Sequence, residues 1–473
     1  MLFNSLSFLI FLPIVLCTYW ALSASVKWQN RWLLVASYFF YGWWDWRYLF
    51  LIAGCSLINF YSGLVIGTTT KRWLKVALLS CCCIVSLGVL GLFKYYNFFI
   101  ESFASLCSCF GIHWSPLILQ IALPVGISFF TFQAMSYTFD VFYGKLKPTR
   151  SVVDFLAFIS FFPQLVAGPI ERATNLLPQF QRSRTFDPQN ALHGITLIVY
   201  GLFKKVVVAD ALSSYVDAAF EKFAFYDNSL TCLIAAFFFS IQIYCDFSGY
   251  SDTARGIAKL FGFELMLNFN RPYLSKSFTE FWRRWHISLS TWFKDYLYIP
   301  LGGNRVTPAK MLRNLWIVFL ISGLWHGANW TFIAWGALHA VYQTVAFLRK
   351  RYLHFSVQQR WYWSVVQIVF LNVGVIFAWI FFRATSIAQA LDFIQMIAKC
   401  DFSCSMSALC AGSTPFAFLF RWWVIALLGI TYLTPKDAKF KTSKGYIAFI
   451  LFLIFSIIVF GQAAGGEFIY FQF

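Results

Sequence analysis

Long apolar runs, separated by short polar segments, recur from the first residues of this 473-residue chain to the last. Each run is close to the roughly 20 residues that an α-helix needs to cross a bilayer. The runs do not alternate polar and apolar residues as the spans of a β-barrel do. The pattern therefore predicts an all-α, polytopic integral membrane protein with about ten or eleven transmembrane helices and additional re-entrant segments.

Most of the apolar runs are predicted to be single spans. They cover residues 5–22, 32–44, 48–67, 76–93, 118–142, 190–213, 229–246, 363–382, 416–433 and 446–462. The first run is followed, not preceded, by its basic residues Lys27 and Arg31, so we expect a retained span rather than a signal peptide. The same charges predict a cytoplasmic first loop and an N-terminus on the opposite, periplasmic side.

Two apolar runs do not fit a single span. Residues 151–168 contain Pro163 and have basic residues on both flanks, which predicts a re-entrant segment. Residues 314–347 are too long for one span and predict two passes, or a re-entrant hairpin, with a bend around 323–329. The stretch 247–313 is the longest relatively polar region, with ten basic and four acidic residues, and we expect it on the cytoplasmic side.

Composition and charge agree with a membrane protein. Hydrophobic residues make up 60% of the chain and charged residues 12%, about half the charged share of a soluble protein. The net charge of +18 comes from lysines and arginines in the loops, where they orient the chain and attract anionic lipid headgroups. We therefore expect membrane lipids, and not nucleic acid, as partners. We also expect one membrane domain over 1–473, with N-terminal helices in 1–142, a core in 143–350 and C-terminal helices in 351–473.

The chain has six histidines, of which His326 lies inside the apolar run 314–347. His326 stands among small residues in Ser322–Trp330, and an ionisable side chain at membrane depth predicts a functional site. A core histidine bonded to a backbone carbonyl is the alternative. His113, His193 and His354 read as surface or capping groups.

Two further histidines are ambiguous. His286 lies in an amphipathic segment with Arg283 and Arg284, which also fits a membrane-surface helix with snorkelling arginines. His339 follows His326 by thirteen residues, a spacing that can suit haem ligation, but no second histidine pair is evident. The chain contains no G-x-S-x-G elbow, phosphate-binding loop or dinucleotide fingerprint.

Several long motifs, taken in order, resemble the membrane-bound O-acyltransferase family and, within it, the bacterial alginate O-acetyltransferase branch. The resemblance covers nearly the whole chain. It is carried by Leu123–Phe129, Phe162–Ile170, Tyr244–Asp252, Asn268–Tyr273, Phe281–Ser290, Trp292–Asn304 and Gly323–Ala328.

The resemblance implies that His326 is the catalytic histidine in a central tunnel and that His286 is the second active-site residue. Neutral imidazole suits His326 as the base that takes a hydroxyl proton, and His286 or backbone N–H groups would stabilise the oxyanion. Residues expected along the donor and acceptor paths are Trp285, Arg283, Arg284, Asp295, Trp325 and Asn329. Arg283 and Arg284 would attract the phosphates of coenzyme A.

The resemblance also implies substrates and partners. Acetyl-CoA would be the cytoplasmic donor, with no bound cofactor or metal, in a bacterial inner membrane. A periplasmic SGNH-type acetyltransferase would complete transfer to a polysaccharide such as alginate. Two alternatives remain: transfer of D-alanine from a carrier protein to teichoic acid, and non-enzymatic transport of lipid or polysaccharide, which would show paired broken helices.

Overall fold

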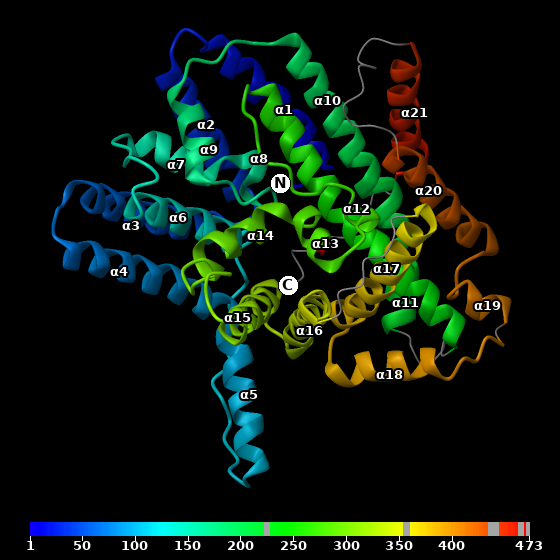
Figure 1. Cartoon of the computed structure of the whole chain (residues 1–473). Coiled ribbons are helices and arrows are strands. Elements are labelled where there is room, and N and C mark those ends of the chain that lie inside the picture. The colour runs from blue at the N-terminus through cyan, green and yellow to red at the C-terminus, as the bar shows by residue number, and fades with distance from the viewer. Residues whose placement is uncertain (222–227, 353–359, 404, 434–443, 462–467, 470–473) are drawn as a thin grey trace. The chain divides into compact units, whose positions relative to one another are not determined.

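The computed structural model describes residues 1–221, 228–352, 360–403, 405–433, 444–461 and 468–469 (Figure 1). All regular secondary structure in these ranges is helical, so the predicted all-α class is confirmed. The chain divides into two compact units. Unit 1 comprises Met1–Ile198 and Ala254–Met266, and unit 2 comprises Val199–Thr253 and Leu267–Phe473.

Unit 1 contains the N-terminal helices and the start of α10. Its helices are α1 (Leu6–Ala21), α2 (Val26–Gly42), α3 (Tyr48–Thr68), α4 (Arg72–Leu90), α5 (Tyr96–Cys109), α6 (Ile127–Phe142), α7 (Val152–Ser160), α8 (Phe162–Leu165), α9 (Ala173–Gln181) and most of α10 (Pro188–Leu202).

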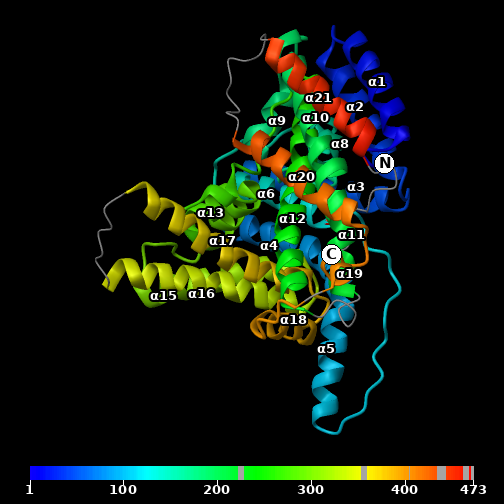
Figure 2. The same cartoon turned by 90° about the vertical axis from the view of Figure 1, so that its right-hand side faces the viewer.

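Unit 2 contains the remaining helices, including all those that carry the candidate site (Figure 2). They are η2 (Phe203–Ala209), α11 (Asp210–Glu221), α12 (Ser229–Leu260), η4 (Pro272–Leu274), α13 (Phe278–Arg284), α14 (Ile287–Phe293), η5 (Lys294–Tyr298), α15 (Pro308–His326), α16 (Trp330–Tyr352), α17 (Trp361–Arg383), α18 (Ile387–Ala398), α19 (Met406–Leu409), α20 (Pro415–Leu433) and α21 (Lys444–Phe460). The last turns of α12 belong to unit 1.

Six helical segments of the described chain are long and apolar enough to cross a membrane. They are Tyr48–Thr68, Arg72–Cys109, Ser229–Leu260, Trp330–Tyr352, Trp361–Arg383 and Pro415–Tyr432, and Leu6–Ala21, Ile387–Ala398 and Ile447–Phe460 are shorter apolar helices. Large apolar side chains on several of these helices are strongly exposed, for example Phe50, Ile84 and Phe370. In water such exposure would be costly, so these side chains fit contact with lipid.

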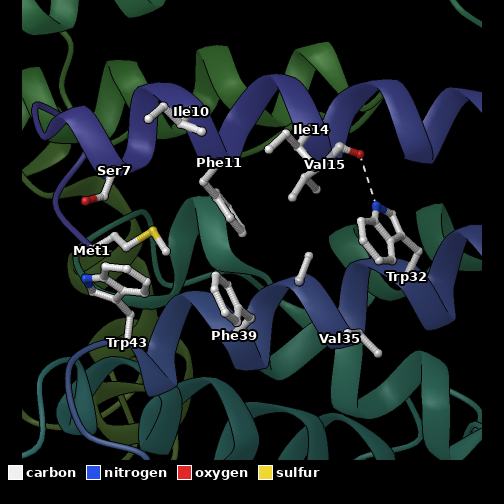
Figure 3. Close-up of a pocket in the computed structure, with 11 residues that line it drawn as sticks. Met1, Ser7, Ile10, Phe11, Ile14, Val15, Trp32, Val35, Phe39 and Trp43 are labelled. Atoms are coloured by element: carbon white, nitrogen blue, oxygen red, sulfur yellow. Dashed lines mark hydrogen bonds between the residues drawn. The ribbon is translucent and has the colours of Figure 1, made fainter.

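An apolar groove runs between α1 and α2 of unit 1, with a volume of about 510 Å³ (Figure 3). Phe11 and Phe39 face each other across it, and the indole N–H of Trp32 donates to the carbonyl of Val15 (3.0 Å) at one end. The groove is lined almost entirely by aromatic and aliphatic side chains of the two helices. Such an apolar lining is compatible with contact with lipid.

The helix predicted over 76–93 continues where a loop was expected over 94–117. A π-helical turn at Gly91–Tyr95 joins α4 to α5, which extends to Cys109. In Figure 1, α5 leaves the direction of α4 steeply and projects away from α3 and α6. Residues 96–109 contain neither proline nor glycine, so nothing ends the helix before Gly111, which adopts a positive φ of 75°.

The span predicted over 118–142 is shorter than expected. Residues 112–124 form no regular helix, and α6 begins only at Ile127. Pro124 lacks a backbone N–H, and Gly126 takes a left-handed conformation (φ 74°) directly before the helix. The broken character predicted for 151–168 is confirmed, because the chain forms two short helices, α7 and α8, interrupted at Phe161. Its re-entrant placement stays a prediction.

The polar stretch predicted to begin at 247 is helical as far as Leu260, because α12 continues through it. Several of its polar side chains, among them Ser251, Asp252 and Thr253, are buried within the protein. The sequence also predicts a basic loop after 416–433, formed by Lys436, Lys439, Lys441 and Lys444. The first three lie outside the described residues, and Lys444 is the first residue of α21.

The run 314–347 forms two helices, α15 and α16, which lie side by side with a break at residues 327–329 (Figure 1). Glycines allow this close approach. A Cβ atom on Gly336 would lie 2.3 Å from the carbonyl oxygen of Phe319, and one on Gly323 would lie 2.3 Å from that of Phe332. Small residues at crossing points are typical of helices that pack within membranes. The predicted bend around 323–329 is therefore confirmed.

Gly336→Ala should force α15 and α16 apart, because the new methyl group meets backbone rather than a mobile side chain. We expect a loss of about 1–3 kcal/mol in the free energy of unfolding, measured as a lower midpoint of thermal unfolding in detergent. Gly54→Ala on α3 is the matched control, since nothing lies within 4 Å of its new Cβ. Equal unfolding midpoints for the two variants would contradict the close-packed hairpin.

Candidate active site

His326 is the last residue of α15, and the turn after it is held by Asn329. Gly327 is extended, and its added Cβ would meet the ring of Phe332 at 2.1 Å. The Asn329 side-chain oxygen accepts from the N–H of Thr331 (3.0 Å), and its amide nitrogen donates to the carbonyl of Thr385 (2.8 Å). The turn thus caps α16, ties it to the end of α17, and leaves His326 on the carbonyl end of α15.

Aromatic rings surround His326, which is 3% exposed. Its ring centroid lies 5.0 Å from Trp325, 5.0 Å from Trp335 and 5.3 Å from Phe382, each approaching edge to face. The carbonyl end of a helix carries partial negative charge and stabilises a cation there. His326 therefore lies where the partial negative charge of the α15 carbonyl end is concentrated.

His286 lies between α13 and α14 and is fully buried. Its backbone is left-handed (φ 42°, ψ 55°), which costs a residue other than glycine about 1–3 kcal/mol and is typical of functional positions. Backbone hydrogen bonds hold this turn against residues 268–270: Ile287 N–H donates to the carbonyl of Asn268, and Asn270 N–H donates to that of Arg284, both at 2.9 Å.

The Asn268 side chain bonds to the same turn and to α12. Its oxygen Oδ1 accepts from the hydroxyl of Ser288 (2.9 Å) and the N–H of Ser288 (3.3 Å), and it lies 3.1 Å from Nδ1 of His286. Its amide nitrogen donates to the hydroxyl of Ser251 on α12 (3.2 Å). All four side chains are buried. Asn268 therefore joins His286 to the long central helix.

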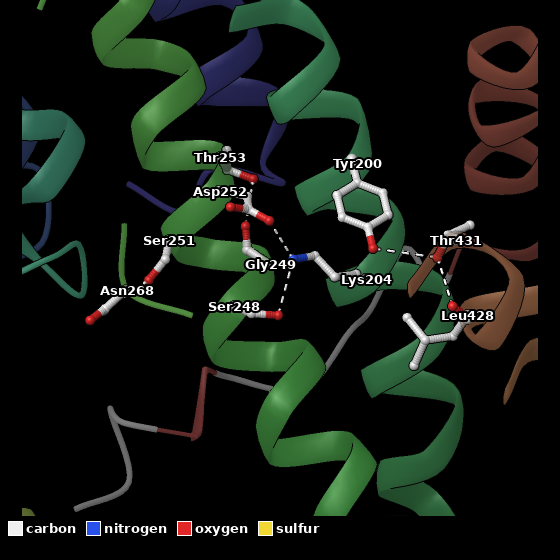
Figure 4. A network of polar contacts seen from close by, with 10 residues as sticks. All are labelled: Tyr200, Lys204, Ser248, Gly249, Ser251, Asp252, Thr253, Asn268, Leu428 and Thr431. Atoms are coloured by element: carbon white, nitrogen blue, oxygen red, sulfur yellow. Dashed lines mark hydrogen bonds and ion pairs between the residues drawn. The ribbon is translucent and has the colours of Figure 1, made fainter. Parts of the chain in front are cut away.

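On its other side, α12 is fixed by buried ion pairs with η2 (Figure 4). Lys204 donates to Asp252 (2.6 Å) and to the hydroxyl of Ser248 (3.0 Å), and Figure 4 shows Ser251 pointing away from them toward Asn268. The neighbouring Lys205 pairs with Asp246 (2.6 Å) and Asp210 (2.9 Å). These pairs explain how a helix with two aspartates in its apolar middle stays buried.

The two predicted catalytic histidines lie together in unit 2. Their ring centroids are 6.3 Å apart, and the indole of Trp325 contacts both, at 5.9 Å from His286 and 5.0 Å from His326. Trp285 is buried beside them, against Phe269 and Trp379. Sequence motifs 40 residues apart therefore meet in one aromatic cluster.

The other predicted path residues lie around this cluster. Arg283 is exposed on α13, and Arg284 is paired with Glu280 (2.6 Å). Asp295 is half-buried on η5, at the far end of α14 from His286. Asn329 serves in the turn after His326. Among the described residues, no three His, Cys, Asp or Glu side chains are grouped as for a metal.

Sequence reasoning missed Trp335 and His339. His339 is fully buried, and its Nδ1 accepts from the indole N–H of Trp282 (3.3 Å), so its Nε2 carries the ring hydrogen. This bond joins α13 to α16, which is a structural role for a residue that the sequence presented only as a weak haem candidate. Trp335 contacts both His326 and His339, and its buried indole N–H has no acceptor among the described residues. A buried donor of this kind calls for a partner, which an ordered water or a bound group would supply.

The two imidazoles are enclosed in this structure. His286 has no exposed surface and His326 is 3% exposed. Tyr244 and Tyr273, whose rings contact Trp285, also line a cavity of about 550 Å³ among α12, α17 and α20. The predicted central tunnel stays a prediction.

Known proteins resemble this chain over most of its length. The model of the membrane-bound O-acyltransferase family matches residues 125–391. A "probable alginate O-acetylase" of Azotobacter vinelandii is 42% identical over 399 residues, which cover 82% of this chain and 76% of that protein. A peptidoglycan O-acetyltransferase of Helicobacter pylori is 37% identical over 428 residues, covering 84% and 79% respectively. A teichoic acid D-alanyltransferase of Bacillus subtilis is 30% identical over 230 residues, covering 46% and 58%.

Burial decides the charge state of His286. Desolvation lowers the pKa of its imidazole from the ordinary 6.5 to about 3, so the ring is neutral at physiological pH. The unfolded ring keeps its ordinary pKa. Protons therefore bind preferentially to the unfolded state as the pH falls from about 6.5 toward 3, and this stabilising contribution is lost over that range.

His286→Gln should make unfolding less sensitive to acid, because glutamine keeps a donor for Asn268 but does not titrate. Between pH 7 and pH 5 we expect the wild type to lose about 2 kcal/mol more than the variant in the free energy of unfolding. The measurement is thermal unfolding at several pH values, with the exposed loop variant His113→Gln as control. If the His286 and His113 variants have equal acid sensitivity, the buried neutral ring is disproved.

Proposed function

The chain belongs to the membrane-bound O-acyltransferase family, and we propose that it transfers an acetyl group from a cytoplasmic thioester to a hydroxyl outside the cytoplasm. The observation that carries this proposal is the pairing of His326 and His286 within one buried aromatic cluster. The relatives named as a probable alginate O-acetylase and a peptidoglycan O-acetyltransferase support acetyl as the acyl group and a cell-envelope polysaccharide as the acceptor.

His326 acts as the general base. It takes the proton of the acceptor hydroxyl while the hydroxyl oxygen attacks the thioester carbonyl carbon, forming a tetrahedral oxyanion. The oxyanion collapses, the carbon–sulfur bond breaks, and the imidazolium returns the proton to the leaving thiolate. The carbonyl end of α15 stabilises the imidazolium between these two steps, because His326 is its last residue.

Trp335 supplies a hydrogen-bond donor for the oxyanion. Its indole N–H is buried, has no acceptor among the described residues, and belongs to a ring 5.0 Å from that of His326. A donor fixed in a water-free site stabilises developing negative charge far better than one in water. The site thus offers a base and an oxyanion donor on two neighbouring helices.

The aromatic enclosure favours transfer over hydrolysis. Water competes with the acceptor hydroxyl for the thioester, and the rings of Trp325, Trp335 and Phe382 exclude it from the surface of His326. An enzyme that carries an activated acyl group between two aqueous compartments needs such a barrier.

The donor proposed is acetyl-CoA, with Arg283 on α13 available to its phosphates, and no cofactor or metal is required by this chemistry. The proposed setting is a bacterial inner membrane with the N-terminus periplasmic. A periplasmic SGNH-type acetyltransferase would carry the group onward to the polysaccharide.

D-alanyl transfer to teichoic acid is the second candidate. It is supported by the Bacillus subtilis relative, which matches less than half of this chain, whereas the O-acetyltransferase relatives match more than four-fifths. The two functions share the chemistry at His326 and differ in the donor, a carrier protein in place of coenzyme A.

His326→Ala should abolish acetyl transfer, with a loss of at least 10²-fold in kcat, because no other group takes the hydroxyl proton. Purified protein in proteoliposomes with radiolabelled acetyl-CoA measures the transfer, and thermal unfolding verifies that the variant is folded. His113→Ala, in an exposed loop, should keep wild-type activity. A folded His326→Ala protein with wild-type turnover would refute the role.

The donor is tested on the same vesicles. With the periplasmic acetyltransferase partner and the acceptor polysaccharide supplied on one side, we expect labelled acetyl-CoA supplied on the other side to yield an acetyl ester on the polysaccharide, while a D-alanyl carrier protein gives no product. Transfer of D-alanine alone would replace the acetyl proposal with the second candidate. Passage of the polysaccharide without any acyl product would instead indicate a transporter.

A further inference from the structure

Asn268 is a buried amide that holds the second histidine of the site. It is 1% exposed and lies in the non-helical segment between α12 and η4. Both of its side-chain ends are occupied: Oδ1 by groups of residues 286–288, and the amide nitrogen by Ser251 of α12. The backbone carbonyl of Asn268 accepts a hydrogen bond from the N–H of Ile287 (2.9 Å). The main chain and the side chain of Asn268 therefore both bond to the turn at residues 286–288.

The orientation of this amide follows from chemistry. The oxygen and nitrogen of an asparagine side chain are alike in shape, so their assignment depends on their partners. Here one partner is the backbone N–H of Ser288, which can only donate, at 3.3 Å. The atom that faces it must be the oxygen, which places the amide nitrogen against the hydroxyl of Ser251.

The orientation of Asn268 then fixes the tautomer of His286. A carbonyl-type oxygen only accepts, so Nδ1 of His286, 3.1 Å away, must carry the hydrogen. The neutral ring has one hydrogen, and Nε2 is therefore left with a lone pair. In this tautomer His286 accepts a hydrogen bond from a substrate and cannot donate one to an oxyanion.

We propose that Asn268 is a positioning residue of the acyltransfer site: its Oδ1 holds His286 in the Nδ1–H tautomer, so that Nε2 presents an acceptor to an O–H or N–H group of the bound substrates. The proposal rests on the proposed function and deepens it. His326 takes the proton of the reacting hydroxyl, and His286 orients a second donor group of a substrate beside it. The oxyanion role expected for His286 passes to Trp335.

The hydrogen bond between Asn268 and Ser251 of α12 keeps the Asn268 amide, and with it the tautomer of His286, fixed. Ser251, which accepts from the Asn268 amide, precedes Asp252, whose carboxylate is paired with Lys204 on η2 (Figure 4). Rotation of α12 would break the buried ion pair, and rotation of the amide would turn N–H groups toward the N–H of Ser288. Both changes are strongly unfavourable in a buried site, so the acceptor nitrogen of His286 is preorganised.

The tautomer is tested directly by ¹⁵N NMR of the full-length protein labelled on histidine. The His286 signal is identified by its loss in His286→Gln. We expect the hydrogen on Nδ1 in the wild type and a mixture of tautomers in Asn268→Ala. A wild-type ring protonated on Nε2 overturns the proposal, whatever the activity of the enzyme and whether or not the Asn268 variant folds.

The catalytic consequence is tested by a double-mutant cycle on kcat. Asn268→Ala should lower kcat by roughly 10- to 100-fold in the wild-type background and have no further effect in His286→Gln, because Asn268 acts through that ring. Asn4→Ala, at an exposed asparagine in the N-terminal segment of unit 1, is the control and should match the wild type. Additive losses in the cycle would overturn the positioning role. If the Nδ1–H tautomer is present but both His286→Gln and Asn268→Ala keep full acetyl transfer, the catalytic role of His286 fails and the positioning role falls with it.

Discussion

The pairing of buried charges along α12 is the constraint on which the site depends. Asp246 and Asp252 lie in a helix that is apolar enough to cross a membrane, and each finds a lysine of η2. An unpaired charge at such a position costs several kcal/mol, so α12 can neither rotate nor slide against η2. A glycine of α12 lets the two segments approach closely enough for this pairing, since a Cβ on Gly249 would lie 3.2 Å from the backbone nitrogen of Lys205.

Different contacts position His286 and His326. Ser251 holds Asn268, which holds His286, whereas His326 is placed by the glycine contacts between α15 and α16. The two paths meet at the bond from Trp282 to His339, which ties the helix before His286 to the helix after His326. His339, for which the sequence indicates no catalytic role, thus helps to set the distance between His286 and His326.

The sequence predicted the features that depend on local pattern. Apolar runs predicted the helical class, and the length of 314–347 with its glycines predicted a bent pair of helices. Average hydrophobicity misplaced three helix boundaries. A π-helical turn continues the chain into α5, and a proline with a left-handed glycine delays the start of α6. Paired charges keep the polar end of α12 helical and buried. His326 and His286 were identified through the family motifs. Asn268 and Trp335 lay within or beside those motifs, but an amide or an indole shows its role only when its partners in space are known.

Enclosure and access place opposite demands on this cluster. Exclusion of water protects the thioester, yet rings that are 0% and 3% exposed cannot bind a substrate without movement. Trp325 contacts both imidazoles, so a shift of this one indole would uncover both at once, while a shift of Trp335 would displace the proposed oxyanion donor. Asn268 positions His286, and the end of α15 positions His326. Neither contact involves Trp325, so this indole can move while the two imidazoles stay in place. The polar contacts of this site therefore belong to the parts that must stay fixed, and its aromatic contacts to the part that must open.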